Sequence, residues 1–252
     1  MRVAIHQPHY FPWLGYFDKM AKVDTFVLMD EVQLEDRSYM LRNRFLQKDG
    51  TLTYLSVTAS KKGYREKAYK EIEVMECARW QKKHMSYLKD LYCHAPHTEE
   101  ILAELMPVFA KDYQFLAEVT RDSMEAVMRL LNIPTKLIYQ SELDWQRRQK
   151  EDDRQMRRSN DVLAICQAVG ASAYMTGAGA SLEFLDQDSF QAAHIPVAVQ
   201  SYACPIYAQR FSSEFIPNIS ALDLLFNCGI EESRRIFWDN VHSTHEFDEI
   251  EA

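Results

Sequence analysis

The sequence has little glycine, no closely paired cysteines and no long apolar run. Seven glycines in 252 residues are too few for a glycine-rich repeat. The five cysteines are scattered without a C-x-x-C pair, which disfavours a disulfide framework or a zinc site and is typical of a reducing cytosol. No segment approaches the roughly 18 apolar residues of a membrane span, and the N-terminus lacks a signal-peptide pattern. We therefore expect a cytoplasmic protein with no membrane partner.

Positive charge is also in deficit. Lysine and arginine total 29 against 37 acidic residues, so the formal net charge is −8. An acidic surface repels nucleic-acid phosphates, and we expect no nucleic-acid partner. The composition is otherwise that of a globular protein, with 47% hydrophobic, 26% charged and 12% aromatic residues. These values exclude a disordered chain and favour a well-filled core.

The order of apolar runs predicts an α/β fold. Strands are expected at residues 3–5, 25–29, 136–139, 173–176 and 195–199. The first two flank a short helix over 15–22, which is the pattern of a βαβ unit with parallel strands. The later strands alternate with helices and should join the same sheet. We expect a single domain over 1–252, with a mostly parallel sheet and flanking helices.

Two regions interrupt this alternation. β-forming runs at 39–47 and 51–58 flank Asp49-Gly50, the signal of a two-residue hairpin turn, and predict a β-hairpin insertion. Helical periodicity then predicts a helical subregion over about 79–132. The segment 146–158, QRRQKEDDRQMRR, has six basic residues against three acidic ones and is expected to be flexible.

The loop after the first strand has an unusual composition. The sequence HQPHYFPWLGYF, residues 6–17, contains two prolines and five aromatic residues, whereas such loops are ordinarily short. In a parallel sheet this loop lies at the ligand-binding edge. The rings of Trp13, Tyr16 or Phe17 could then stack on a nucleobase, and His6 could serve as a general base. The alternative is that the rings fill the core and His6 binds a backbone carbonyl.

Three other groups of residues could take part in chemistry. Arg42 and Arg44 share one face of the first hairpin strand and could clamp a diphosphate, or form a solvated edge paired with acids. Gly177 and Gly179 follow a strand, where backbone amides could approach a phosphate or carboxylate, although tight helix–strand packing also needs glycine. His84, on the apolar face of a predicted helix, is either a second candidate base or a satisfied core residue. No metal is expected.

These motifs resemble the WbqC-like family, which is named from bacterial O-antigen gene clusters. The matching segments are HQPHYFPWLGYF at 6–17, Asp24 and Asp30 with Gln33, Arg42-Asn43-Arg44, Trp80 with Lys83-His84, TGAGASLEFLD at 176–186, Tyr207 with Gln209, and FIPNISALDLLFNCG at 215–229. The resemblance covers nearly all of residues 1–229. Beside the residues above, it gives as substrate-binding residues Gln7, Tyr10, Asn43, Tyr207 and Gln209.

The resemblance implies work on a nucleotide-activated sugar in O-antigen or lipopolysaccharide biosynthesis. We expect a transferase that forms an amide, placing a glycyl or other acyl group on the amino group of a nucleotide-linked amino sugar. The donor is left open between an aminoacyl carrier, a thioester such as an acyl carrier protein's, and an adenylate made from ATP. As the base, His6 would titrate at about pH 6 to 7. A noncatalytic nucleotide-sugar binding or scaffold protein is the alternative.

A weaker resemblance concerns PWLGYFDKMAKVDTFVLMD, residues 12–30. Its layout is similar to that of nucleotidylyltransferases and pantothenate synthetase, in which a His-x-Gly-His turn opens a helix beneath the ATP phosphates. Trp13-Leu14-Gly15-Tyr16 keeps the glycine and lacks both imidazoles. The resemblance implies a related α/β fold and leaves an ATP-using amide ligase as a further alternative, with an anion held at the helix N-terminus.

Overall fold

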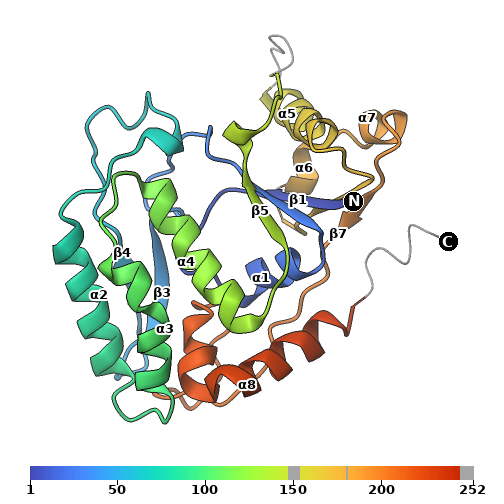
Figure 1. Ribbon diagram of the computed structural model, residues 1–252. Coiled ribbons are helices and arrows are strands. Elements are labelled where there is room, and N and C mark those ends of the chain that lie inside the picture. The colour runs from blue at the N-terminus through green and yellow to red at the C-terminus, as the bar shows by residue number, and fades with distance from the viewer. Residues whose placement is uncertain (147–153, 180, 245–252) are drawn as a thin grey trace.

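The computed structural model describes residues 1–146, 154–179 and 181–244 (Figure 1). Its centre is a five-stranded sheet in the spatial order β5-β2-β1-β6-β7, in which every neighbouring pair is parallel. The strands are β1 Arg2–His6, β2 Thr25–Leu28, β5 Lys136–Tyr139, β6 Ala173–Thr176 and β7 Val197–Val199. The predicted α/β fold with a parallel sheet is confirmed.

Helices cover both faces of this sheet. They are α1 Leu14–Ala21, α2 Cys77–Leu91, α3 Thr98–Ala110, α4 Leu116–Leu131, α5 Arg154–Ala168, α6 Ser181–Phe184, α7 Gln187–Ala192 and α8 Leu222–Val241, with 3-10 turns η1 Tyr69–Glu71 and η2 Gln140–Glu142. Side chains alternate along a strand, so Val3 and Ile5 join the apolar cluster of α5 and α7. Ala4 joins the cluster that contains α1 and α8. Apolar residues on both faces are typical of a parallel sheet.

The order of the strands reverses beside β1. From β1 the chain runs outward through α1 to β2 and later to β5. It then returns through α5 to β6, on the other side of β1, and continues to β7. The connections that leave the carboxyl ends of β1 and β6 therefore diverge, and ligands of parallel α/β sheets bind at such a switch point. The topology places a candidate site beside His6 and Thr176.

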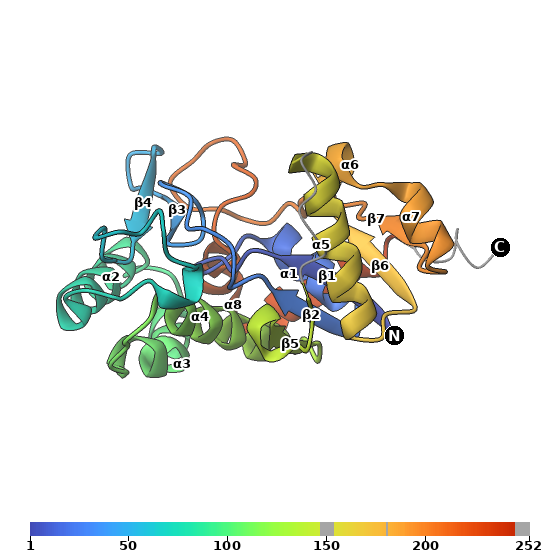
Figure 2. The ribbon, with the colours of Figure 1, turned by 90° about the horizontal axis from the view of Figure 1, so that it is seen from above.

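The hairpin and helices α2–α4 lie on the side of the sheet away from α7 (Figures 1 and 2). In the hairpin, β3 Arg42–Leu46 pairs with β4 Leu52–Ser56 in antiparallel register. Helices α2–α4 occupy the predicted helical subregion. The core is continuous between this part and the sheet, because Phe26 of β2 and Leu105 of α3 belong to one cluster of buried side chains.

The hairpin connection is longer than the two-residue turn predicted from Asp49-Gly50. Gly50 N donates to Gln47 O at 3.0 Å, and Gln47 N donates to Thr51 O at 2.7 Å. Lys48, Asp49 and Gly50 therefore form a three-residue loop, in which Gly50 has a left-handed φ of 80°. Asp49 accepts hydrogen bonds from both N and Oγ1 of Thr51. This local bonding favours the longer loop.

The start of α5 also differs from the prediction, and α8 contains a kink. Residues 147–153 of the segment expected to be flexible lie outside the described residues, but 154–158 already belong to α5. In α8, Gly229 interrupts the helix with φ 77° and ψ 174°, and the helix then resumes as far as Val241. A Cβ on Gly229 would lie 2.6 Å from the His97 ring. Glycine is thus required at this kink by both its conformation and the close approach.

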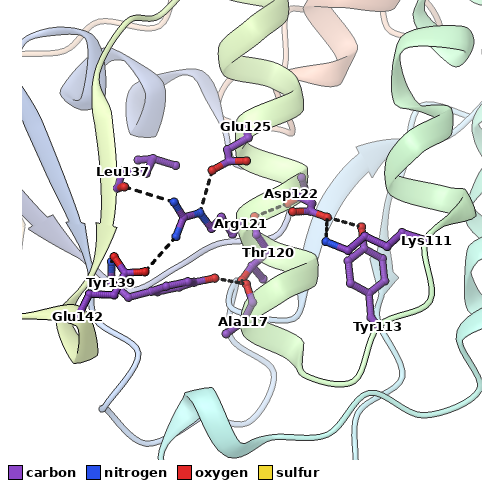
Figure 3. A network of polar contacts seen from close by, with 11 residues as sticks. Lys111, Tyr113, Ala117, Thr120, Arg121, Asp122, Glu125, Leu137, Tyr139 and Glu142 are labelled. Carbon is purple, nitrogen blue, oxygen red and sulfur yellow. Dashed lines mark hydrogen bonds and ion pairs between the residues drawn. The ribbon is translucent and has the colours of Figure 1, made fainter.

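Arg121 of α4 connects the helical subregion to the sheet (Figure 3). Its Nε donates to Glu125 at 2.8 Å, and its Nη1 donates to Glu142 at 3.5 Å. Its Nη2 donates to the backbone oxygen of Leu137 in β5 at 3.4 Å. The guanidinium also lies 4.9 Å from the ring centroid of Tyr139. One side chain thus holds α4 against β5 through polar and ring contacts.

Arg121→Ala is expected to lower the free energy of unfolding by about 1–2 kcal/mol, because it removes several bonds from a side chain that is 28% exposed. Arg235→Ala is the matched control. Its side chain is 61% exposed, and its partners Glu232 and Asp239 lie on the same helix, where such pairs contribute about 0.3–0.5 kcal/mol. Urea denaturation measures both changes. Equal destabilisation by the two substitutions would contradict the bridging role of Arg121.

Candidate functional site

A cleft of about 1060 Å³ opens at the carboxyl edge of the sheet. Its lining comes from the end of β1 and the loop after it, from α1, α5 and α6, from the turn after β6, and from segments 29–35, 65–68 and 200–202. His6 after β1 and Gly177 after β6 both line the cleft. The cleft therefore occupies the switch point that the strand order defines.

The loop of residues 6–17 divides its aromatic side chains between the cleft and the core. Trp13 and Tyr16 line the cleft. Tyr10, Phe11 and Phe17 are no more than 1% exposed and contribute nothing to the lining. The sequence predicts the ring-rich loop at the ligand-binding edge, but its composition does not show which rings face inward.

Trp13 and Tyr202 form an aromatic wall of the cleft. Their ring centroids are 5.2 Å apart, with the rings edge to face. The ring of Trp13 covers Gly15 so closely that a Cβ there would lie 2.1 Å from it. Glycine at the start of α1 is therefore needed for the position of this ring.

The rings of His6, His9 and Tyr16 contact one another at the end of β1. The centroid of His6 lies 4.9 Å from those of both His9 and Tyr16, and His9 stacks on Tyr16 at 4.8 Å. Nδ1 of His6 is 2.9 Å from the backbone oxygen of Gln7. A carbonyl oxygen can only accept, so Nδ1 holds the hydrogen and Nε2 keeps its lone pair. Gln7 and His6 both line the cleft.

Desolvation keeps both imidazoles neutral at pH 7. It lowers the pKa of His6 well below 6.5, and the nearby charges of Lys19 and His9 lower that pKa further. Desolvation and Lys19 lower the pKa of His9 to about 3. The expectation that His6 titrates between pH 6 and 7 is therefore wrong, because the sequence pattern contains no information on the loss of water around the ring.

Lys19 is a cleft residue that the sequence motifs did not indicate. It is 4% exposed and lines the cleft. Its Nζ lies 5.8 Å from the ring centroid of Phe26, and no carboxylate of the described residues pairs with it. Desolvation lowers its pKa from 10.5 to about 7. Since Lys19 follows Tyr16 by three positions and Gly15 by four, helical periodicity alone could have placed it on the cleft face.

The turn after β6 forms another wall. Thr176 Oγ1 donates to Ser181 Oγ at 2.9 Å, and Ser181 Oγ donates to Gly177 O at 3.1 Å. A Cβ on Gly179 would have no heavy atom within 4 Å, and one on Gly177 would meet only Ser181 Oγ at 3.8 Å. Neither packing nor a left-handed φ requires these glycines. They leave open space beside a backbone that faces the cleft.

Charges of both signs surround the opening. The lining contains the basic residues Lys19, Arg65, Lys67, Arg157 and Arg158 and the acidic residues Glu31, Glu35, Glu66 and Asp161. Glu31 is engaged by Lys70 at 2.7 Å and by Trp145 Nε1 at 3.2 Å. In a protein of net charge −8, this balanced region is more favourable to an anion than the average surface.

The hairpin arginines lie outside this cleft. The guanidinium of Arg42 stacks on the ring of Tyr54, 3.9 Å from its centroid. Nη2 of Arg44 donates to the backbone oxygen of Asn218 at 2.8 Å. Both arginines are therefore engaged within the protein, and the structure does not bring them together with His6.

Asn43 and His84 support the aromatic loop from the core. Asn43 is fully buried, and its Nδ2 donates to the backbone oxygens of Tyr10 at 3.2 Å and Phe11 at 2.6 Å. Nδ1 of His84 is 2.9 Å from the Tyr10 hydroxyl, and desolvation lowers the pKa of His84 to about 4. None of these residues lines the cleft.

Tyr207 and Gln209 also lie outside the cleft. The Tyr207 hydroxyl donates to Asp223 Oδ2 at 3.0 Å. The amide of Gln209 exchanges two hydrogen bonds with the backbone of Ile216, at 2.9 and 2.8 Å. These contacts fix the long connection between β7 and α8.

Some features are absent from the described ranges. No helix within 1–146, 154–179 or 181–244 has the length and apolar character of a membrane span. The same residues contain no group of three or more His, Cys, Asp or Glu side chains arranged to hold a metal ion. The five cysteines are free thiols.

Comparison with known proteins agrees with the motifs. The model of the WbqC-like protein family matches residues 7–235. The chain belongs to the WbqC-like family. It is similar to the protein named "Uncharacterized protein Rv1507c" from Mycobacterium tuberculosis (strain ATCC 25618 / H37Rv), with 31% identity over 231 residues that cover 91% of this chain and 95% of that protein. No solved structure matches the chain.

The WbqC-like match includes most of the cleft. Trp13, Tyr16, Lys19 and Gly177 all lie within the matched range, and His6 precedes it by one residue. The family assignment therefore concerns the same part of the chain that forms the site.

Lys19→Met is expected to stabilise the fold, and most strongly at low pH. Lys19 has a pKa of about 7 when folded against 10.5 as its ordinary value, so the unfolded chain binds more protons between these values. The unfolding free energy of the wild type therefore rises with pH from about 7 upward. Methionine removes this penalty, so the variant should exceed the wild type by up to about 5 kcal/mol at pH 6 and about 2 kcal/mol at pH 9.

Urea denaturation at pH 6 and pH 9 measures this difference. Lys136→Met, at an exposed position of β5, is the control and should show no comparable dependence on pH. A stability gain from Lys19→Met that is the same at both pH values would show that Lys19 is not a desolvated cation.

Proposed function

We propose that this WbqC-like protein is a transferase of surface-polysaccharide biosynthesis that forms an amide on the amino group of a nucleotide-linked amino sugar. The observation that carries the proposal is a neutral His6 in a large cleft at the switch point of a parallel sheet. Nucleotides bind at such positions in related α/β architectures. The volume of about 1060 Å³ slightly exceeds the usual range of small-molecule sites, about 300–1,000 Å³, and leaves room for a ligand as large as a nucleotide sugar.

The aromatic wall and the glycine turn suit the two ends of such a ligand. The rings of Trp13 and Tyr202 offer a surface for stacking of a nucleobase. The backbone around Gly177 and Gly179 is open to the approach of an oxyanion. These features support binding of a nucleotide sugar by the transferase.

The proposed reaction moves an acyl group from a donor to the sugar amine. The amine nitrogen attacks the acyl carbon and forms the C–N bond, and the bond from that carbon to the leaving group breaks. The leaving group, a carrier thiolate or alkoxide or an adenylate phosphate, departs with the electron pair. Nε2 of His6 accepts the amine proton, because its Nδ1 hydrogen is held by Gln7 O.

The strand order favours a second candidate, an ATP-using amide ligase. Counted along the sheet, the parallel strands have the order 3-2-1-4-5, which is shared with doubly wound nucleotide-binding folds. Tyr16 stands where a His-x-Gly-His turn would have its second imidazole, and it contacts both His6 and His9. The imidazoles of His6 and His9 therefore lie close to the position that the second histidine of such a turn would occupy. A ligase would consume ATP itself and release AMP and pyrophosphate, whereas the transferase would use a donor that is already activated and would consume no ATP.

The test is intact-mass analysis of nucleoside-diphosphate amino sugars incubated with the protein and an acyl or aminoacyl donor, with and without ATP. The transferase predicts a mass increase equal to the acyl group without ATP. An increase that depends on ATP and is matched by AMP release would favour the ligase. Tight binding with no mass change for any donor would favour the noncatalytic binding protein.

His6→Gln is expected to lower the rate at saturating substrate by roughly 100-fold or more, which is the usual effect of losing a general base. Glutamine keeps a hydrogen-bonding side chain but cannot take the proton, so the ligand affinity should stay within about twofold. His94→Gln, at an exposed position outside the cleft, is the control and should keep the wild-type rate. Normal turnover of His6→Gln would exclude His6 as the base.

A further inference from the structure

We propose that Lys19 binds the diphosphate of the nucleotide in the cleft, beside the glycine turn after β6, and takes up a proton as it does so. The ligand class is a nucleoside diphosphate, and this identity rests on the proposed function. The inference assigns the diphosphate to α1 and the turn after β6, instead of to the hairpin arginines of β3.

The first observation is a buried cation that no carboxylate of the described residues accompanies. Buried charges in proteins are ordinarily paired. Lys19 is 4% exposed, and no carboxylate within the described ranges pairs with it. The adjacent carboxylate of Asp18 is engaged by Gln200 Nε2 at 2.7 Å and by Lys22 at 3.0 Å. An anion that enters the cleft would supply the partner that the described residues do not provide to Lys19.

The second observation is the open backbone at the turn after β6. Gly177 and Gly179 line the same cleft as Lys19, and neither has a conformation or a close neighbour that demands glycine. A side chain there would project into space that a ligand could otherwise use. Small residues at a strand end allow phosphate oxygens to reach backbone N–H groups. The turn therefore offers N–H donors to a phosphate, and this observation does not depend on the charge of Lys19.

Compared with the described imidazoles and tyrosines around it, Lys19 is the group that changes charge near neutral pH. From β1 and its loop come His6 and His9, whose pKa values lie below the neutral range. Tyr16 of α1 and Tyr174 of β6 have pKa values raised above 10 by burial. The carboxylates that line the cleft are Glu31, Glu35, Glu66 and Asp161, and Glu31 is held by Lys70. The pKa of Lys19, about 7, lies between the pKa values of the imidazoles and those of the tyrosines.

An anion beside Lys19 favours its charged form and raises its pKa. At pH 8 free Lys19 is about nine-tenths neutral, as follows from a pKa of about 7. A phosphate with a second pKa of about 6 is already fully ionised at this pH. Binding should therefore draw close to one proton from the solvent onto the Lys19 amine.

The experiment is isothermal titration calorimetry of the full chain with UDP and with inorganic pyrophosphate at pH 8, in buffers of different ionisation enthalpy. The wild type should take up close to one proton when it binds UDP. Lys19→Met should bind UDP on the order of 10- to 100-fold more weakly, the range expected for a charge-assisted bond, and should take up no proton. Lys136→Met, exposed on β5, should match the wild type in affinity and proton uptake.

A double variant distinguishes the two possible diphosphate sites. Arg42→Ala with Arg44→Ala should retain the wild-type proton uptake and bind UDP more tightly than Lys19→Met does. Loss of UDP binding in this double variant with wild-type affinity in Lys19→Met would overturn the inference, and so would proton uptake that persists in Lys19→Met. If pyrophosphate binds with the affinity and proton uptake of UDP, the site recognises the diphosphate itself.

The inference and the proposed function fail separately. UDP binding that depends on Lys19, without any acyl product in the mass assay, would leave the phosphate site intact and refute the transferase. Acyl transfer by the wild type, together with unchanged UDP binding by Lys19→Met, would support the transferase and refute the phosphate site.

Discussion

The pairing of β1 with β2 on one side and with β6 on the other is the constraint on which the arrangement of the molecule depends. In this register His6 lies opposite Leu28, and Ala4 lies opposite Met175. The three strands therefore end at one edge of the sheet, and their connections diverge from it. A cleft at this edge follows from the connectivity, and the helical subregion and the hairpin support it without forming its floor.

A concentration of basic groups is the second characteristic of the site. Lys19 lies close enough to His6 and His9 that its charge lowers the pKa of both imidazoles. Together with the loss of water, this charge keeps the imidazoles neutral, while desolvation lowers the pKa of Lys19 itself to about 7. Such an arrangement lowers the stability of the empty protein, as is common where a site is organised for a ligand instead of for the fold.

The sequence predicts the elements of the sheet well, because short apolar runs between helical segments can only be strands of a parallel sheet. It also places the 6–17 loop and the turn after β6 at the same edge, and residues 6, 7, 13, 15–16 and 176–179 line the cleft. The roles of Arg42, Asn43 and Gln209 are harder to predict, because an arginine or amide that holds a distant backbone segment has the same local pattern as one that binds a ligand. Lys19 was missed for a related reason, since a lysine in an amphipathic helix is ordinarily assigned to the solvent. Its burial depends on rings and strands that lie elsewhere in the sequence.

The hydrogen bond between His6 Nδ1 and the backbone oxygen of Gln7 leaves one ring nitrogen, Nε2, through which this imidazole can exchange a proton. The carbonyl retains the hydrogen on Nδ1, so Nε2 is the nitrogen that can gain or lose a proton. A proton that reaches Nε2 from a molecule in the cleft must leave by the same side of the ring. In the proposed reaction, a proton taken up by Nε2 must therefore be returned within the cleft, either to the departing leaving group or to water, because the Gln7 carbonyl leaves no exit through Nδ1.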